Sequence, residues 1–380
     1  MSYRPSIDLE RHREPLLAIL RVVTSQPAMD RRDLEQLRRR YRKEDGGLFR
    51  NDDLIHAYRQ FAGSFGLPAY DPAVLNALRM KPVRTSSGVT TVTVLTKPYP
   101  CPGECIFCPN DVRMPKSYLS DEPGAQRAEL NGFDPYLQSY MRLTALRKIG
   151  HPTDKVEVIV LGGTWSFYPE TYQIWFIKRI FDALHDFGNS IDRCEEVRTL
   201  LNEGSQFKPH TEIVTESDAQ SVKIAGTHID QTYNQVVQSV YRDEMYRSRQ
   251  QAQLIADGLA ERTAITEFAT WTELESSHCE NETAACRCVG LVIETRPDHI
   301  SVEEVLRVRR LGYQSRDRHS EPQRSGADQE IGADIKWQRR GERSSSYGKQ
   351  ASKFTPIGCP ISTDRTLVPI LEIIESYGIL

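Results

Sequence analysis

The stretch that decides the fold is Thr96-Lys97-Pro98-Tyr99-Pro100-Cys101-Pro102-Gly103-Glu104-Cys105-Ile106-Phe107-Cys108, which carries three cysteines at C-x3-C-x2-C spacing. It follows a strand-like run over 89–95, and its prolines and glycine exclude a helix. A loop of this kind can wrap three thiolates around one side of a [4Fe–4S] cluster and leave the fourth iron without a protein ligand. The open iron is then a binding position for a substrate or cosubstrate.

Two other interpretations of the three cysteines are a structural zinc site and reduced, unliganded thiols. Structural zinc takes four closed ligands, usually as two C-x2-C pairs, and no fourth cysteine or histidine lies near this loop. The spacing, with Phe107 just before the last cysteine, resembles the cluster loop of radical S-adenosylmethionine (SAM) enzymes. In those enzymes the amino and carboxylate groups of SAM chelate the open iron. The pattern therefore favours a cluster.

The overall composition is that of a globular protein with no membrane partner. The 380 residues suffice for two or more domains, and no run of sequence approaches the apolar length of a membrane span. The first residues lack the apolar core of a secretory signal. Eight cysteines without such a signal favour a reducing compartment. We therefore expect a cytoplasmic protein, and the sequence does not give its oligomeric state.

The first 84 residues form a basic helical module. They contain 16 Lys and Arg against 11 Asp and Glu, a net charge of +5, whereas the remaining residues carry −8. The apolar spacing predicts helices over 7–24, 31–42, 51–61 and 72–78. Such a module suits a polyanionic partner, although a solvated helix face would have the same charge. The phosphate-contact candidates on the second helix are Arg38, Arg39, Arg40 and Lys43.

Beyond the module, strands and helices alternate. The sequence predicts a long functional loop over 109–134, a helix from Pro135 to Gly150, a buried strand over 155–161 and a helix from Pro169. This alternation is typical of a parallel sheet with right-handed crossovers, in which chemistry gathers at the carboxyl ends of the strands. The cysteine loop and the Gly162-Gly163-Thr164 loop both follow a strand. Their common position supports the cluster interpretation independently of the spacing.

The second half of the chain is harder to interpret. Residues 188–282 are polar, with helical patterns over 217–224, 233–246 and 252–259, and we interpret them as an insertion. The sheet resumes over 288–298, and a helix over 301–311 begins at Ser301. A second metal site is conceivable from four side chains, but their spacing favours reduced thiols beside a strand. These four are His278, Cys279, Cys286 and Cys288.

Residues from about Lys81 to Gly312 resemble the catalytic subunit of Elongator, Elongator complex protein 3, in its bacterial form. The matching blocks are Thr85-Ser86-Ser87-Gly88-Val89, Cys101 to Pro109, Phe133-Asp134-Pro135-Tyr136-Leu137-Gln138, Gly150 to Lys155, Leu161-Gly162-Gly163-Thr164-Trp165 and Ile293-Glu294-Thr295-Arg296-Pro297-Asp298. The basic helices also look like the tRNA-binding region of that family. The resemblance implies an α/β fold with a parallel (β/α) radical SAM barrel. It also implies an enzyme that carboxymethylates C5 of the wobble uridine of tRNA using acetyl-CoA.

The resemblance also implies roles for individual residues. Cys101, Cys105 and Cys108 would hold the [4Fe–4S] cluster. Gly162, Gly163 and Thr164 would let backbone groups approach the amino end of SAM, because glycine removes the steric barrier. Glu294 and Arg296 would contact SAM or substrate, with an ion pair inside the barrel as the alternative, and Lys155 would contact acetyl-CoA unless it is an ordinary lysine before a strand. The sequence assigns no catalytic residue.

The resemblance ends after about residue 312. Residues 313–350 are rich in Arg, Ser, Gln and Gly and have neither helical nor strand periodicity. We interpret this as a shift of the reading frame, since codons can be chosen whose other frames spell segments similar to the family's next barrel units. The nucleotide sequence of the gene tests this hypothesis. We therefore expect residues 85–312 to form only part of a barrel, with no acetyltransferase domain, and residues 313–380 to be mostly disordered, with one helix near 367–374.

Two rival functions remain at this point. A radical SAM enzyme with another substrate would have the cysteine loop without the Elongator-like blocks. A non-catalytic RNA-binding remnant would use the basic helices alone. Cluster absorbance and the formation of 5′-deoxyadenosine separate an enzyme from a scaffold that only binds tRNA in a salt-sensitive way.

Overall fold

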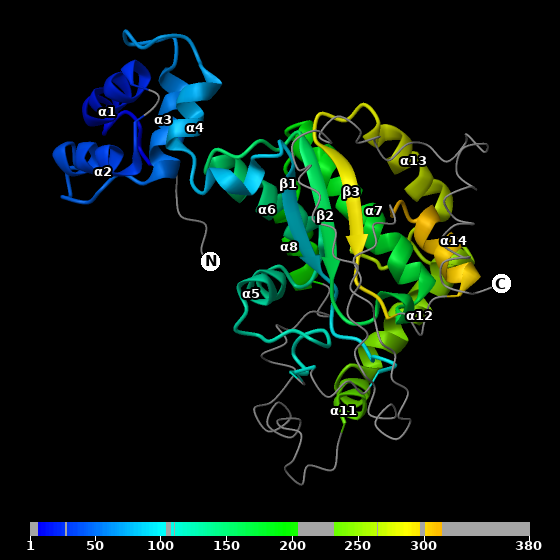
Figure 1. Ribbon diagram of the computed structural model, residues 1–380. Helices are drawn as coiled ribbons and strands as arrows, with labels where there is room; N and C mark the ends of the chain where they lie inside the picture. The colour runs from blue at the N-terminus through cyan, green and yellow to red at the C-terminus, as the bar shows by residue number, and fades with distance from the viewer. Residues whose placement is uncertain are drawn as a thin grey trace, which may run out of the picture. The chain divides into compact units, whose positions relative to one another are not determined.

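The computed structural model describes residues 7–26, 29–103, 108–109, 111–203, 232–263, 265–296 and 301–313. The chain divides into two units (Figure 1). One comprises residues 1–91 with 141–155, and the other comprises residues 92–140 with 156–380. Cys105, the predicted helices over 217–224 and 367–374, and nearly all of the predicted tail lie outside the described residues.

The first unit contains four helices of the basic module: α1 Arg13–Ser25, α2 Arg31–Arg40, α3 Asn51–Phe61 and α4 Pro72–Leu78. Local signals determine where they begin. Asp30 accepts hydrogen bonds from the backbone N–H groups of Arg32 and Asp33 at 2.7 and 2.9 Å, and so caps α2. The apolar side chains of all four helices share one core, which includes Leu16, Leu20, Leu34, Ile55 and Leu78. These helices confirm the predicted elements, although α1 begins at Arg13 and not at residue 7.

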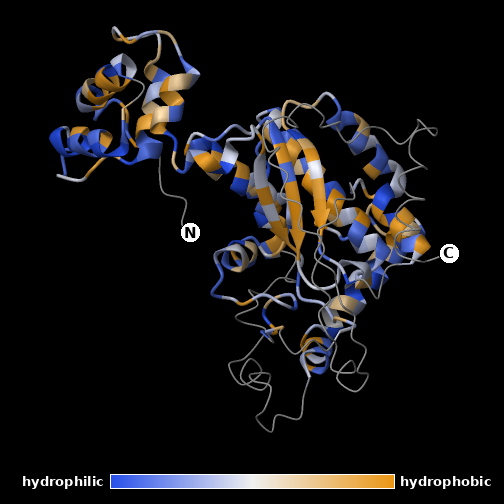
Figure 2. Cartoon of the chain, viewed as in Figure 1, coloured by the Kyte–Doolittle hydropathy of each residue, from blue (hydrophilic) through white to orange (hydrophobic). Residues whose placement is uncertain are grey.

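The sheet is parallel and has the order β1-β2-β3, with β1 Thr90–Leu95, β2 Lys155–Leu161 and β3 Arg287–Ile293. Hydrophobic residues make up most of β2 and β3, whereas β1 alternates between threonine and hydrophobic residues along part of its length (Figure 2). Alternate residues of β2 are buried, as expected for a strand with one face in the core. The predicted α/β class and all three strand positions are confirmed, while the barrel remains a prediction.

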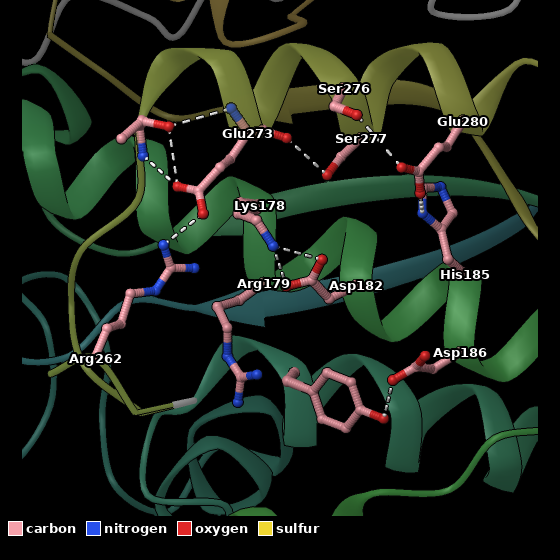
Figure 3. Close-up of polar contacts among 12 residues, drawn as sticks. Lys178, Arg179, Asp182, His185, Asp186, Arg262, Glu273, Ser276, Ser277 and Glu280 are labelled. Atoms are coloured by element: carbon pink, nitrogen blue, oxygen red, sulfur yellow. Dashed lines mark hydrogen bonds and ion pairs between the residues drawn. The ribbon is translucent and has the colours of Figure 1, made fainter.

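Helices of the second unit lie beside the sheet. The long helix α7, Glu170–Gly188, packs against β3, and α13, Trp271–Asn281, packs along α7. These helices carry polar contacts on their surface (Figure 3). Lys178 donates a hydrogen bond to Asp182 within α7, and His185 of α7 lies 3.4 Å from the Glu280 carboxylate of α13. Further helices are α6 Pro135–Lys148, α8 Cys194–Glu203 and α14 Val302–Arg310, and short 3₁₀ turns lie at Pro82–Thr85 and Trp165–Phe167.

Two predictions about local structure are wrong. The region 109–134 is not loop throughout, because it contains the helix α5, Pro123–Leu130, which begins with proline at its first position. The predicted helix over 233–246 is interrupted at Tyr241, giving α11 Tyr233–Val240 and α12 Arg242–Ala256. Within the described part of the chain, no helix is long and apolar enough to cross a membrane.

Candidate functional site

The segments that follow the three strands meet at the carboxyl edge of the sheet. The backbone N–H of Trp165, after β2, donates to the carbonyl of Glu294, after β3, at 3.2 Å. The hydroxyls of Ser166 and Thr295 lie 2.6 Å apart. The N–H of Thr96, directly after β1, donates to the carbonyl of Leu161 at 2.9 Å. The structure therefore places the cysteine loop, the Gly-Gly-Thr loop and the Glu-Thr-Arg segment together, as the alternation of strands and helices predicted.

Two of the three loop cysteines are described, and neither forms a disulfide. Cys101 is buried, with its Sγ 3.3 Å from the Thr164 hydroxyl. Cys108 is partly exposed, with its Sγ 3.0 Å from the Ser117 hydroxyl. Ser117 has a φ of 86°, a region that non-glycine residues rarely adopt. Each thiol thus has a hydroxyl neighbour, one from the loop after β2 and one from the segment after the cysteines.

Glycines allow close approach at two points of this site. A Cβ on Gly162 would lie 2.0 Å from the Thr96 hydroxyl oxygen, which itself contacts the Tyr168 hydroxyl at 2.8 Å. A Cβ on Gly103 would lie 2.0 Å from an Arg296 guanidinium nitrogen, so Arg296 packs directly over the cysteine loop. In contrast, a Cβ on Gly163 would meet nothing closer than 3.7 Å. The steric need for glycine is therefore at Gly162 and Gly103.

Glu294 is held by a hydrogen bond from the hydroxyl of Tyr118 at 2.8 Å. Glu294 is exposed, but nearby protein atoms partly desolvate its carboxylate and raise its pKa above the ordinary value, and the hydrogen bond from Tyr118 opposes that rise. The same environment, together with the negative charge of Glu294, raises the pKa of Tyr118. Glu294 therefore lies in the site with a partner that the sequence did not suggest.

Lys155 does not join these loops. It is exposed and begins β2, whereas Gly162 follows the other end of the same strand. At about 3.3 Å per residue the two ends are separated by roughly 20 Å. The predicted contact of Lys155 with acetyl-CoA stays a prediction.

The four predicted phosphate-contact residues, in α2 and directly after it, differ in their exposure and in the partners they already have. The guanidinium of Arg38 is half-buried and donates to Asn51 at 3.0 Å, and desolvation lowers its pKa. Lys43 forms an ion pair at 3.0 Å with Asp53, which is buried. Arg39 and Arg40 are both exposed, and Arg39 pairs with Glu35 one turn earlier on the helix. Arg39 and Arg40 are therefore the better placed of the four for a phosphate.

The structure adds residues from the insertion to the site. The side chain of Asn234, in α11, forms two hydrogen bonds with the backbone of Cys101. Tyr233 donates to the carbonyl of Met114 and Tyr241 donates to that of Val112, so the insertion also contacts the segment after Cys108. Lys116 is buried there, with its ammonium 4.8 Å from the centre of the Tyr233 ring. No sequence pattern marked these side chains, because their partners lie more than a hundred positions away.

The thiols of the loop fit an iron–sulfur cluster in their chemistry. Cys101 and Cys108 are sulfur donors on one irregular loop and form no disulfide, and a cluster of this kind is bound by thiolates. Among the described residues, no three His, Cys, Asp or Glu side chains gather as a metal site, and Cys105 is not among those residues.

Around His278, too, the described residues form no cluster that could hold a metal ion. Burial lowers the pKa of His278 to about 4 and raises that of the Cys288 thiol to about 12. Cys279 is disulfide-bonded and so is not available as a thiolate ligand, whereas Cys286 and Cys288 are buried and form no disulfide. This agrees with the expected structural role for Cys286 and Cys288, and Cys279 departs from the expectation of a reduced thiol.

Comparison with known proteins relates part of the chain to one class of enzyme. No family model matches the chain. Over about 30% of its length, at 40–50% identity, it is homologous to the tRNA uridine(34) acetyltransferases and Elongator complex protein 3.

Three relatives illustrate the range of these matches. The tRNA uridine(34) acetyltransferase of Methanocaldococcus infernus is 50% identical over 115 residues, which are 29% of this chain and 22% of that protein. The protein of the same name from Dehalococcoides mccartyi is 46% identical over 125 residues, 33% of this chain and 27% of the relative. Elongator complex protein 3 of Homo sapiens is 39% identical over 128 residues, 31% of this chain and 23% of the relative. The chain thus spans about a quarter of the length of these relatives.

A solved structure is also similar in part. It is that of the archaeal Methanocaldococcus infernus Elp3 with an N-terminal deletion (1–46), at 25% identity and a TM-score of 0.27, covering 60% of this chain and 27% of that one.

Proposed function

We propose that this chain carries the cluster-binding region of a radical SAM enzyme that modifies the wobble uridine of tRNA with acetyl-CoA. The observation that supports this most strongly is the meeting of three loops at the carboxyl edge of the sheet. There Cys101 contacts Thr164, and Arg296 packs over Gly103. The homology of part of the chain to tRNA uridine(34) acetyltransferases supports the choice of substrate.

In this proposal Cys101, Cys105 and Cys108 would bind a [4Fe–4S] cluster, and three protein ligands would leave one position for SAM. When bound and reduced, the cluster supplies the electron that cleaves SAM. The Cys101 sulfur lies 3.3 Å from the Thr164 hydroxyl, which would donate to the thiolate in the cluster-bound state and so stabilise its negative charge. Glycine at 162 and 163 leaves the backbone of that loop accessible to the amino end of SAM.

Glu294 and Arg296 supply the polar groups of the proposed SAM or substrate pocket. The guanidinium of Arg296 offers donors to a carboxylate or phosphate close to the cysteine loop. Glu294, oriented by Tyr118, accepts hydrogen bonds from hydroxyls or an ammonium group when it is ionised. Because its pKa is raised, the protonated form extends to a higher pH than that of an exposed glutamate.

The region 1–84 binds tRNA in this proposal, with Arg39 and Arg40 as the principal phosphate contacts among the four candidates. Arg38 and Lys43 support these contacts indirectly, because Arg38 already donates a hydrogen bond to Asn51 and Lys43 already forms an ion pair with Asp53. The alternative function, a non-catalytic tRNA-binding protein, is favoured by the same exposed arginines and requires no cluster. The domain organisation proposed is therefore a basic helical domain over 1–84 followed by a radical SAM domain over 85–312.

Anaerobic reconstitution of the full chain with iron and sulfide tests the proposed enzyme. We expect the broad absorbance of a [4Fe–4S] cluster and, after reduction, formation of 5′-deoxyadenosine from SAM. The chain in which all three loop cysteines are replaced by alanine is the control and should show neither. A wild-type chain that takes up no iron but still shifts tRNA would overturn the enzyme in favour of the binding protein.

The tRNA contact has its own test. Replacing Arg39 and Arg40 by glutamine should weaken tRNA binding and reduce the dependence of log K on log salt by about 1 per lost phosphate contact. The charge-matched control replaces Arg193 and Arg198, whose ion pairs lie with Asp186 and Glu195. Equal salt dependence in the two double variants would contradict a specific role for α2.

A further inference from the structure

The backbone of Cys101 is held by a single side chain from the insertion. The Cys101 N–H donates to Oδ1 of Asn234 at 2.9 Å, and Nδ2 of Asn234 donates to the carbonyl of Cys101 at 2.6 Å. One amide therefore satisfies both backbone polar groups of the first cysteine of the loop. It pairs with them as a neighbouring strand would, at a position where the chain has left the sheet.

The helix that carries Asn234, together with Tyr241 directly after it, also holds the segment after the last cysteine. The hydroxyl of Tyr233 donates to the Met114 carbonyl at 2.9 Å, and that of Tyr241 donates to the Val112 carbonyl at 3.1 Å. An apolar cluster fixes the helix at this point, and its buried members are Val112, Tyr233, Val236, Val237 and Tyr241. Within three residues of Met114 lies Ser117, whose hydroxyl contacts Cys108. The helix α11 thus fixes both limbs of the cysteine loop.

This arrangement has a direct effect on where the thiols lie. A loop rich in proline and glycine has few backbone hydrogen bonds of its own, so its course depends on external partners. Fixing the peptide groups on either side of Cys101 restricts the direction of its Cα–Cβ bond, and with it the position of Sγ beside Thr164. Figure 1 shows α11 and α12 beyond the carboxyl ends of the strands, where such a restraint acts on the proposed site.

We infer that Asn234 is a positioning residue that holds the Cys101 thiol in place for the cluster, and that α11 is part of the cluster-binding region and not a peripheral insertion. This inference rests on the proposed function. Under this inference, iron retention depends not only on the three cysteines but also on Asn234, which lies 133 positions after Cys101.

The first test uses the full chain without metal, so that it does not depend on a cluster. The rate of alkylation of each cysteine by iodoacetamide is followed by peptide mass spectrometry. Asn234→Ala should raise the rate at Cys101 by about ten-fold, because both hydrogen bonds to its backbone are lost. The rate at Cys194, a buried thiol on α8, is the internal reference and should not change.

Two further variants separate positioning from folding. Asn234→Asp keeps the acceptor for the Cys101 N–H but loses the donor to the Cys101 carbonyl. The alkylation rate at Cys101 in this variant should therefore lie between those of the wild type and Asn234→Ala. Gln238→Ala, at an exposed position of the same helix, should behave as the wild type. An unchanged rate at Cys101, or an equal rise at Cys194, would overturn the positioning role.

The second test follows iron after anaerobic reconstitution. The Asn234→Ala chain should lose iron to a chelator several-fold faster than the wild type, and the electron paramagnetic resonance signal of its reduced cluster should be altered. If both chains hold iron equally well with identical signals, the inference fails while the proposed function stands. If the wild-type chain takes up no iron, the proposed function fails, and the alkylation rates alone decide whether Asn234 holds Cys101.

Discussion

Two cysteines in this chain are held in the same way but in different surroundings. Asn234 forms two hydrogen bonds with the backbone of Cys101, and Asn281 forms the same two bonds with Cys288, at 2.8 and 2.9 Å. Cys288 lies in β3 with no solvent exposure, and its thiol donates to the carbonyl of Gly290. Cys101 lies in the loop that follows β1, beside the Thr164 hydroxyl.

The two cysteines therefore differ in the surroundings of their thiols and not in the hydrogen bonds to their backbone. Burial in β3 raises the pKa of Cys288 to about 12, so the thiolate needed for a metal ligand is not accessible there. Its amide partner serves stability. At Cys101 the same device acts on an irregular loop, where it determines the position of a proposed ligand.

The largest effect is expected from the cysteines themselves. Replacing Cys101 by alanine should abolish the cluster, whereas replacing Cys288 by alanine should leave iron content at about four per reconstituted chain. The physical reason is that burial in β3 raises the pKa of the Cys288 thiol, which disfavours the thiolate that a metal ligand needs. Iron and sulfide analysis after anaerobic reconstitution measures the cluster content of both variants. Loss of iron in the Cys288 variant, with its fold intact by circular dichroism, would contradict the distinction.

The buried side of the comparison predicts a dependence of stability on pH. His278, on the same helix as Asn281, is 2% exposed, and burial lowers its pKa to about 4 from an ordinary 6.5. Between these values the unfolded chain binds more protons, so the free energy of unfolding should rise as pH increases from about 4 to 6.5. Its full contribution is present above 6.5 and amounts to about 3 kcal/mol.

Urea unfolding of the wild type and of His278→Gln at several pH values checks this prediction. The variant lacks the titrating ring, and the difference between the two chains removes the contribution of the carboxylates. The wild type should lose more stability than the variant on acidification. Parallel pH curves for the two chains would show that the histidine does not titrate in this way.

Glycines at the carboxyl edge offer a matched pair of smaller changes. Gly162→Ala should reduce the free energy of unfolding by about 2 kcal/mol, because its Cβ would collide with the short, hydrogen-bonded side chain of Thr96. Gly163→Ala should change it by less than about 0.5 kcal/mol, since the space beside it is open. Thermal or urea unfolding measures both, and equal effects would mean that the close approach at Thr96 is easily relieved.

The two asparagines should also differ in their effect on stability. Asn281→Ala leaves the buried N–H and carbonyl of Cys288 without partners and should cost about 2 kcal/mol. Asn234 is only half-buried, so water can replace its amide, and Asn234→Ala should cost about 1 kcal/mol. The distinction between the two cysteines is supported if Asn281→Ala costs more stability while Asn234→Ala loses more iron. It is contradicted if Asn281→Ala also releases iron.

Much of the fold could be predicted because its signals are local. Asp30 and Ser301 mark helix starts a few residues away from the groups they bind, and the apolar runs of β1 and β2 are buried strands as expected. The helix α5 was missed because eight residues with little apolar periodicity resemble a loop. The break at Tyr241 was missed because the helical pattern continues across it.

The candidate site was predictable in part for the same reason. The cysteines, Gly162, Thr164, Glu294 and Arg296 all follow strands, and strand order brings such segments together. The contacts of Asn234 with Cys101 and of Tyr118 with Glu294 depend on tertiary packing over long separations. No local pattern encodes them. The division of the four basic candidates into exposed and engaged side chains likewise required the positions of Asn51 and Asp53.

The most direct test of the central claim is the electron paramagnetic resonance spectrum of the reconstituted, reduced chain before and after addition of SAM. Three protein thiolates with one open iron predict a [4Fe–4S]⁺ signal that changes when SAM binds. A cluster signal that SAM leaves unchanged, or no cluster signal at all, would contradict the account.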